Sequence, residues 1–127
     1  MHSEPDFYLI LYEPVVAGPW DCSVEERLQV RRPGDDYLKV RLIPTIRVPA
    51  VYPPIDISEV VLATREVGTT LHPPSGFPLG VYVARLVGRP DDGIFSADDL
   101  VVMAWGELYD SATDAAARVT QLGGGKG

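Results

Sequence analysis

Residues 21–43, DCSVEERLQVRRPGDDYLKVRLI, contain the clearest structural pattern in this sequence. Apolar and polar residues alternate on both sides of Pro33-Gly34, which is the pattern of two half-buried strands. Proline fixes its own φ and glycine permits a positive φ, so this dipeptide predicts the turn between the strands. The sequence therefore predicts a hairpin with one face on the core and one in water. Its core-facing residues are Trp20, Cys22, Val24, Leu28, Val30, Leu38, Val40 and Leu42.

Glu26 is the one acid on the core-facing side of this hairpin. A helix over the first half is the alternative, since Ser23-x-x-Glu26 has the form of a capping box. Such a helix would have only Val24 and Leu28 as its apolar stripe, so a strand is favoured. We expect Glu26 to mark a β-bulge or to form a buried ion pair with an arginine.

The water-facing side of the hairpin is rich in positive charge. Facing residues on two paired strands lie close together, so these side chains should gather into one basic ridge. Glu25 and Gln29 interrupt it. The ridge consists of Arg27, Arg31, Lys39 and Arg41.

The flanking sequence predicts further strands at residues 7–12, 57–67, 80–87 and 100–109. Four prolines in residues 44–54 predict an edge strand or an extended connection there, because proline cannot donate a ladder hydrogen bond. Ser96-Ala97-Asp98-Asp99 predicts one helical turn before the last strand.

One helix is expected near the end, at about 111–122. Ser111 and Asp114 resemble a helix N-terminal box, and Gly123 should stop the helix before a flexible glycine-rich tail, 123–127. The apolar stripe is Ala112, Ala115, Ala116, Val119 and Leu122.

These elements predict a single α+β domain, residues 1–122, of about six or seven mostly antiparallel strands. The strands would form a curved sheet, a barrel or a two-layer sandwich, with the one C-terminal helix. Residues 7–12, 81–87 and 100–105 are apolar on both faces, yet an alanine-rich helix covers little area. A second sheet, closure into a barrel or a partner subunit must cover the rest.

Charge and composition exclude several classes of function. Eleven basic against eighteen acidic residues give a net charge of -7, the wrong sign for a protein that neutralises phosphates, so no nucleic acid is expected. No apolar run approaches the roughly 20 residues of a membrane-spanning helix, so no membrane association is expected. With a single cysteine, Cys22, we expect a soluble, cytoplasmic protein without disulfides.

The chemistry-bearing residues do not assemble into a catalytic or metal site. His2, His72 and Cys22 lack the spacing of zinc or iron ligands, and Cys22 on a core-facing position should be a buried, inert thiol. No catalytic residue, metal or cofactor is therefore predicted.

Two segments are the candidates for binding. The proline-stiffened loop 68–79 would present His72 and Phe77, which together with Tyr52 would form an aromatic recognition patch. Residues 90–114 carry seven acids and no base, and a basic partner could dock on them. The acidic binding candidates are Asp91, Asp92, Asp98 and Asp99.

The function predicted from these features is a non-catalytic protein-interaction or assembly module that binds a protein partner or itself. If the basic ridge and the acidic segment lie on opposite sides, copies would associate head to tail. One alternative is a small-ligand-binding protein or small hydrolase with a pocket under the 68–79 loop. Another is an acidic inhibitor or immunity-type protein that docks on a basic partner.

Overall fold

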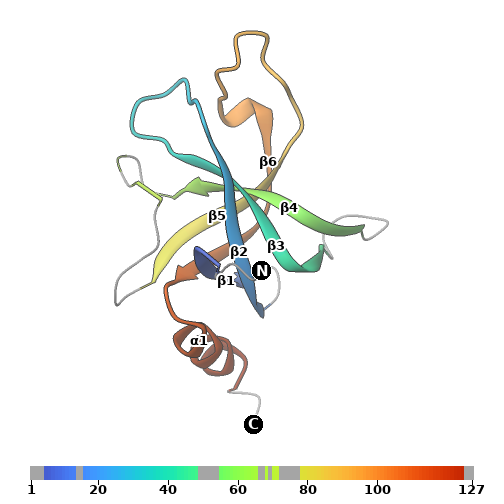
Figure 1. Ribbon diagram of the computed structural model, residues 1–127, viewed down its shortest axis with the longest axis vertical. Helices are drawn as coiled ribbons and strands as arrows, with labels where there is room; N and C mark the ends of the chain where they lie inside the picture. Colours follow the sequence, from blue (N-terminus) through green and yellow to red (C-terminus); the bar gives the residue numbers. More distant parts are fainter. Residues whose placement is uncertain are drawn as a thin grey trace.

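The computed structural model describes residues 5–13, 16–48, 55–65, 68, 70–71 and 78–124. Within this part of the chain, six antiparallel strands follow one another around a closed barrel, and the first strand pairs with the last (Figure 1). The strands are β1 (Phe7–Glu13), β2 (Ala17–Leu28), β3 (Tyr37–Val48), β4 (Ile55–Thr64), β5 (Leu79–Leu86) and β6 (Leu100–Tyr109), followed by helix α1 (Ala112–Gly124). The predicted α+β class is confirmed in its barrel form.

The predicted hairpin is present as β2 and β3. Cys22 lies opposite Leu42 and Val24 opposite Val40, and the register then shifts between Val24 and Glu26. Glu26 is exposed, so the bulge is confirmed and the buried ion pair is wrong. The extra residue of a bulge reverses the alternation that follows it.

Side chains fill the inside of the barrel. Every strand contributes inward-facing residues, as the period of two requires. Burial of each large aliphatic side chain stabilises the fold by roughly 1.5–3 kcal/mol. The buried cluster comprises Phe7, Leu9, Leu11, Trp20, Cys22, Leu38, Val40, Leu42, Val60, Leu62, Leu71, Val81, Val83, Met103, Ala104 and Leu108.

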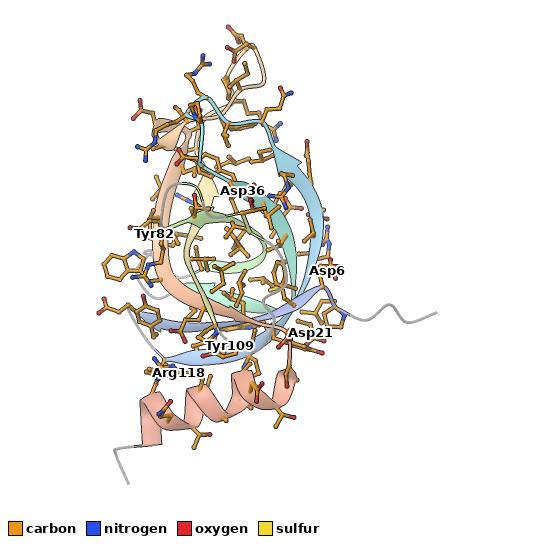
Figure 2. The ribbon with its side chains drawn as sticks, turned by 90° about the vertical axis from the view of Figure 1, so that its left-hand side faces the viewer. Asp6, Asp21, Asp36, Tyr82, Tyr109 and Arg118 are labelled. Atoms are coloured by element: carbon orange, nitrogen blue, oxygen red, sulfur yellow. The ribbon has the colours of Figure 1, made fainter. Side chains whose placement is uncertain are left out.

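Leu71 joins this core from outside the strands, and two charged side chains hold its backbone in place. The Asp36 carboxylate accepts hydrogen bonds from the Leu71 N–H, at 2.6 Å, and from Arg27. Arg27 Nη2 donates to the Leu71 carbonyl at 2.9 Å. Both backbone polar groups of this fully buried residue are therefore satisfied. Figure 2 shows Asp36 within the barrel wall.

Helix α1 covers the outer face of β1 and β6 at one end of the barrel (Figures 1 and 2). Ile10, Tyr109 and Ala115 are buried there, with Val119 and Leu122 packed against them. The Asp114 N–H donates to Ser111 Oγ at 3.3 Å, which confirms the predicted helix start.

One carboxylate ties the helix to the barrel. Glu107 Oε1 accepts hydrogen bonds from the Tyr109 hydroxyl, at 2.8 Å, and from Arg118 Nε, at 3.1 Å. Burial and the hydrogen bond to Glu107 raise the pKa of Tyr109. The phenol therefore stays protonated and continues to donate this bond.

Two loops meet at the opposite end and cover another part of the outer wall (Figure 1). The Arg31 N–H donates to the Phe95 carbonyl, and the Phe95 N–H donates to the Gln29 carbonyl, both at 2.8 Å. Beneath them lies a second buried cluster of Leu28, Tyr37, Val61 and Ala63, with Val30, Tyr82, Leu86, Phe95 and Leu100 packed against it. The predicted helical turn in the second loop is present as the 3₁₀ turn η1 (Ala97–Asp99).

The edge strand expected within residues 44–54 is confirmed where the structure describes it: β3 continues through Pro44 to Val48, and its last three residues pair with β4 alone. Residues 49–54 lie outside the described residues. The β2–β3 pairing ends at Ile43 and the β3–β4 register shifts between Arg41 and Ile46, so the proline falls where the ladder is already interrupted. Helix α1, expected to stop at Gly123, continues to Gly124, while residues 125–127 lie outside the described residues.

Replacing Gly106 tests the closure of the barrel. A Cβ at this inward position would lie well inside van der Waals contact with the Ile10 carbonyl oxygen on the adjacent strand. We expect Gly106→Ala to lower the free energy of unfolding by roughly 1–3 kcal/mol in urea denaturation, as overpacking does. Gly123→Ala is the matched control: its Cβ would meet only Val16 Cγ1, at 4.0 Å. This helical change should stabilise by about 0.4–1 kcal/mol. Equal stability of the two variants would contradict the expected clash.

Candidate protein-interaction surface

Part of the outer wall on β6 remains open to solvent. Val102 and Trp105, whose ladder partners Ala84 and Tyr82 share one face of β5, are 48% and 40% exposed, although β6 is one of the strands predicted to be apolar on both faces. Helix α1 covers the end of this strand near Tyr109, and the two loops cover its beginning near Leu100. The exposed residues lie between these covers.

Trp105 is held in place by an aromatic neighbour. It lies opposite Tyr82 in the β5–β6 ladder, with the ring centroids 6.4 Å apart and the ring planes at 54°. Tilted aromatic pairs at this distance are favourable. Figure 2 shows Tyr82 on the side of the barrel away from Asp6. A large apolar side chain is thus presented to solvent in a fixed orientation.

Arg65 lies beside these aromatic residues. Its Nη1 donates to the Tyr12 hydroxyl, and its guanidinium carbon is 5.8 Å from the centre of the Tyr12 ring, a cation–π contact. A Cβ at Gly80 would come within 2.8 Å of the same Nη1. The absence of a side chain at Gly80 therefore gives Arg65 its path across the sheet. We call Tyr82, Val102, Trp105 and Arg65 the Trp105 surface.

A groove of about 300 Å³ adjoins the Trp105 surface. Asp35, on its rim, lies 3.5 Å from Arg32 and accepts a hydrogen bond from the Tyr37 hydroxyl at 3.4 Å. Burial and the charge of Asp35 raise the pKa of Tyr37, so this phenol remains a donor. The lining residues are Arg32, Asp35, Tyr37, Ala63, Thr64, Arg65, Tyr82, Ala97, Leu100 and Val102.

The four residues of the predicted basic ridge do not form one ridge. Lys39 and Arg41 lie near Glu59, at 3.5 and 3.8 Å, and Arg41 also pairs with Glu25 at 3.0 Å. Arg27 instead binds Asp36 and the Leu71 carbonyl. The bulge at Glu26 explains this correction, because it reverses the direction of the residue that follows.

The fourth basic residue, Arg31, joins the acidic segment. Its Nη2 lies 2.7 Å from Asp92 Oδ2 and 3.3 Å from the Ile94 carbonyl. Arg31 therefore lies on the same side as the acidic segment, so the charge separation on which head-to-tail assembly was conditional does not hold for this residue.

The four acidic candidates have different surroundings. Asp92 also accepts the Ile94 N–H at 3.0 Å, and Asp99 accepts the Ser96 N–H at 2.9 Å at the start of η1. These two carboxylates thus hold the loop together. Asp91, Asp92 and Asp98 are all exposed, and Asp99 is partly buried.

The aromatic patch predicted from His72, Phe77 and Tyr52 lies outside the described residues. Beside the described part of that loop is a surface hollow of about 410 Å³, lined by Arg27, Gly34, Asp35, Asp36, Gly68 and Thr70. The Asp36 carboxylate in it already accepts two hydrogen bonds.

The described residues with reactive or ligating groups are not gathered into a site. Cys22 is fully buried, and burial raises the pKa of its thiol, so the nucleophilic thiolate is suppressed. Across the described ranges, no group of three or more His, Cys, Asp or Glu side chains is placed to hold a metal ion. Nor does this part of the chain contain a helix long and apolar enough to cross a membrane.

No sequence motif singles out Trp105, Tyr82 or Arg65. The usable signal was the apolar character of residues 100–105 on both faces, combined with a shortage of elements to cover them. The pattern alone did not show which of the three such strands would stay uncovered.

Compared with protein-family models, with curated proteins and with solved structures, this chain shows no match.

Replacing Arg31 tests the ion pair between Arg31 and Asp92, because the pKa of the Asp92 carboxyl depends on Arg31. The hydrogen bond from Arg31, then that from the Ile94 N–H, lowers the pKa of Asp92 below its ordinary 3.8. The pair therefore stabilises the contact between the loops above about pH 3.8, and the contribution is lost as pH falls through the lower pKa of the folded state. In Arg31→Gln, carboxyl NMR should show Asp92 titrating closer to 3.8. Glu25 is the internal control, because its lowered pKa depends on Glu59 and Arg41. An unchanged Asp92 would contradict the pairing.

Proposed function

We propose that this protein is a non-catalytic protein-interaction module and that the Trp105 surface is its docking site. The observation that carries the proposal is the uncovered apolar wall of β6, where Trp105 is 40% exposed. Large apolar side chains that lie together on an otherwise polar surface are typical of interaction sites. Tryptophan, tyrosine and arginine are also the residues that most often dominate binding energy at interfaces.

The chemistry of the groove favours a particular occupant. Its lining combines apolar and aromatic residues with two cations, Arg32 and Arg65, and a single acid, Asp35. Asp35 is already engaged by Arg32 and by the Tyr37 hydroxyl. The partner that complements this surface is a different protein, with a segment that places an apolar side chain beside a carboxylate.

The two alternative functions, a small-ligand-binding protein or hydrolase and an acidic inhibitor, receive less support. Core side chains occupy the interior of the barrel, so a ligand would need a surface site such as the hollow beside Thr70. An inhibitor that docks through residues 91–114 would bind its partner with the acidic side chains of this segment. Two of these, Asp92 and Asp99, already form hydrogen bonds within the protein. We retain the cytoplasm as the proposed compartment, because an unpaired cysteine suits a reducing environment.

Replacing Trp105 tests the docking site directly. Peptides selected from a random library on the wild-type protein should combine an aromatic or aliphatic residue with Asp or Glu. Trp105→Ala should weaken their binding by roughly 30-fold, as the loss of a hot-spot side chain does. The measurement is isothermal titration calorimetry, which reads the affinity of the variant as well as that of the wild type. In the wild type, the emission of the exposed Trp105 should also shift to the blue on binding, while the buried Trp20 contributes a constant background.

Ile43→Ala is the matched control, since Ile43 is a 57% exposed apolar residue on β3 that belongs neither to the Trp105 surface nor to the groove. Its peptide affinity should equal that of the wild type, and thermal unfolding should show that both variants are folded. Equal peptide binding by Trp105→Ala would overturn the assignment. Light scattering covers the remaining case: a dimer that Trp105→Ala dissociates would show that the occupant is a second copy rather than a different protein.

A further inference from the structure

A second concavity is lined by residues of β3, of β4 and of the end of β5. It has a volume of about 230 Å³ and contains Lys39, Arg85 and Arg89, with Glu59 among them. The apolar residues lining it include Val61 and Leu86. We call it the Lys39 pocket. It is a different site from the Trp105 surface, and the two share no lining residue.

The charge of the Lys39 pocket is opposite to that of the whole molecule. The chain carries a net charge of -7, yet three cations line this pocket against one carboxylate. Glu59 is balanced by Lys39 Nζ at 3.5 Å and by Arg41 Nη2 at 3.8 Å. Neither Arg85 nor Arg89 has a carboxylate within 4.0 Å among the side chains that the structure places. Among the described side chains, the two guanidinium groups therefore line the pocket without a direct ion pair, and Glu59 is its one carboxylate.

We propose that the Lys39 pocket binds a phosphate group. Guanidinium groups present planar, forked donors that match the oxygens of phosphate, and two of them with a lysine supply both the donors and the charge. The pocket is concave, so part of the ligand would be withdrawn from solvent and its attraction to the cations would be screened less than on a flat surface. Val61 and Leu86 provide contact for an organic group attached to the phosphate. A small phosphomonoester should therefore bind more tightly than inorganic phosphate.

The test is an NMR titration of the full chain at low ionic strength, with inorganic phosphate and with phenyl phosphate as separate probes. Saturable shifts are expected at the amides of β5 and of residues 87–89. Arg85→Gln and Arg89→Gln should each weaken binding by about tenfold, which is typical for the loss of a hydrogen bond between charged groups. Arg32→Gln removes the same charge from the other groove and should leave the affinity unchanged.

Glu59→Gln provides a test that cannot be confused with loss of the fold. It removes the one negative charge from the pocket and releases Lys39, so both probes should bind severalfold more tightly. Arg85→Lys keeps the charge but loses the fork, and should retain only part of the affinity. Tighter binding of phenyl phosphate would identify an organic phosphate as the ligand class, and equal binding would identify free phosphate.

Three results would overturn the proposal. They are shifts that do not saturate with either probe, an Arg32→Gln effect as large as that of Arg85→Gln, and weaker binding by Glu59→Gln. None of these results bears on the Trp105 surface, whose assignment depends on Trp105→Ala alone.

Discussion

The hydrogen-bonded ladder between β1 and β6 is the constraint on which the rest of the structure depends. Because it closes the barrel, each of the six described strands pairs with a strand on either side along part of its length, which protects most of their ladder edges. Closure also requires the two backbones to approach closely at Gly106, where a Cβ has no room. Closure of the barrel also gives each strand two different faces. Side chains on the inner face fill the interior, whereas the outer face must be covered by the helix and the loops.

The covering of the outer face determines where this protein can bind other molecules. Helix α1 covers one end, and the loops around Arg31 and Phe95 cover the other. Neither reaches Val102 and Trp105, and the aromatic contact with Tyr82 fixes Trp105 without burying it. An exposed side chain that is already ordered loses little conformational entropy on binding. This physical advantage favours the Trp105 surface over the charged loops as the docking site.

Charge on this molecule is mostly used for its own structure. Arg27 holds the backbone of Leu71 over the core, Arg31 joins two loops, and Arg118 ties α1 to the barrel through Glu107. These contacts account for much of the basic ridge and of the acidic segment. The Lys39 pocket differs, because its cations outnumber the carboxylate that they surround. We therefore place the two proposed sites at side chains that the fold itself does not use: the exposed Trp105 and the cations of the Lys39 pocket.

The sequence by itself determined the elements. Alternation in residues 21–43, the bulge at Glu26 and the helix start at Ser111 follow from local periodicity and capping, and local interactions largely decide such features. The tertiary structure decided which faces meet. That Arg27 turns toward Asp36, that Arg31 reaches Asp92 and that Trp105 stays uncovered all depend on pairings between distant segments. Periodicity specifies which side chains share a face of a strand, but the tilt and register of the closed barrel decide what that face contacts.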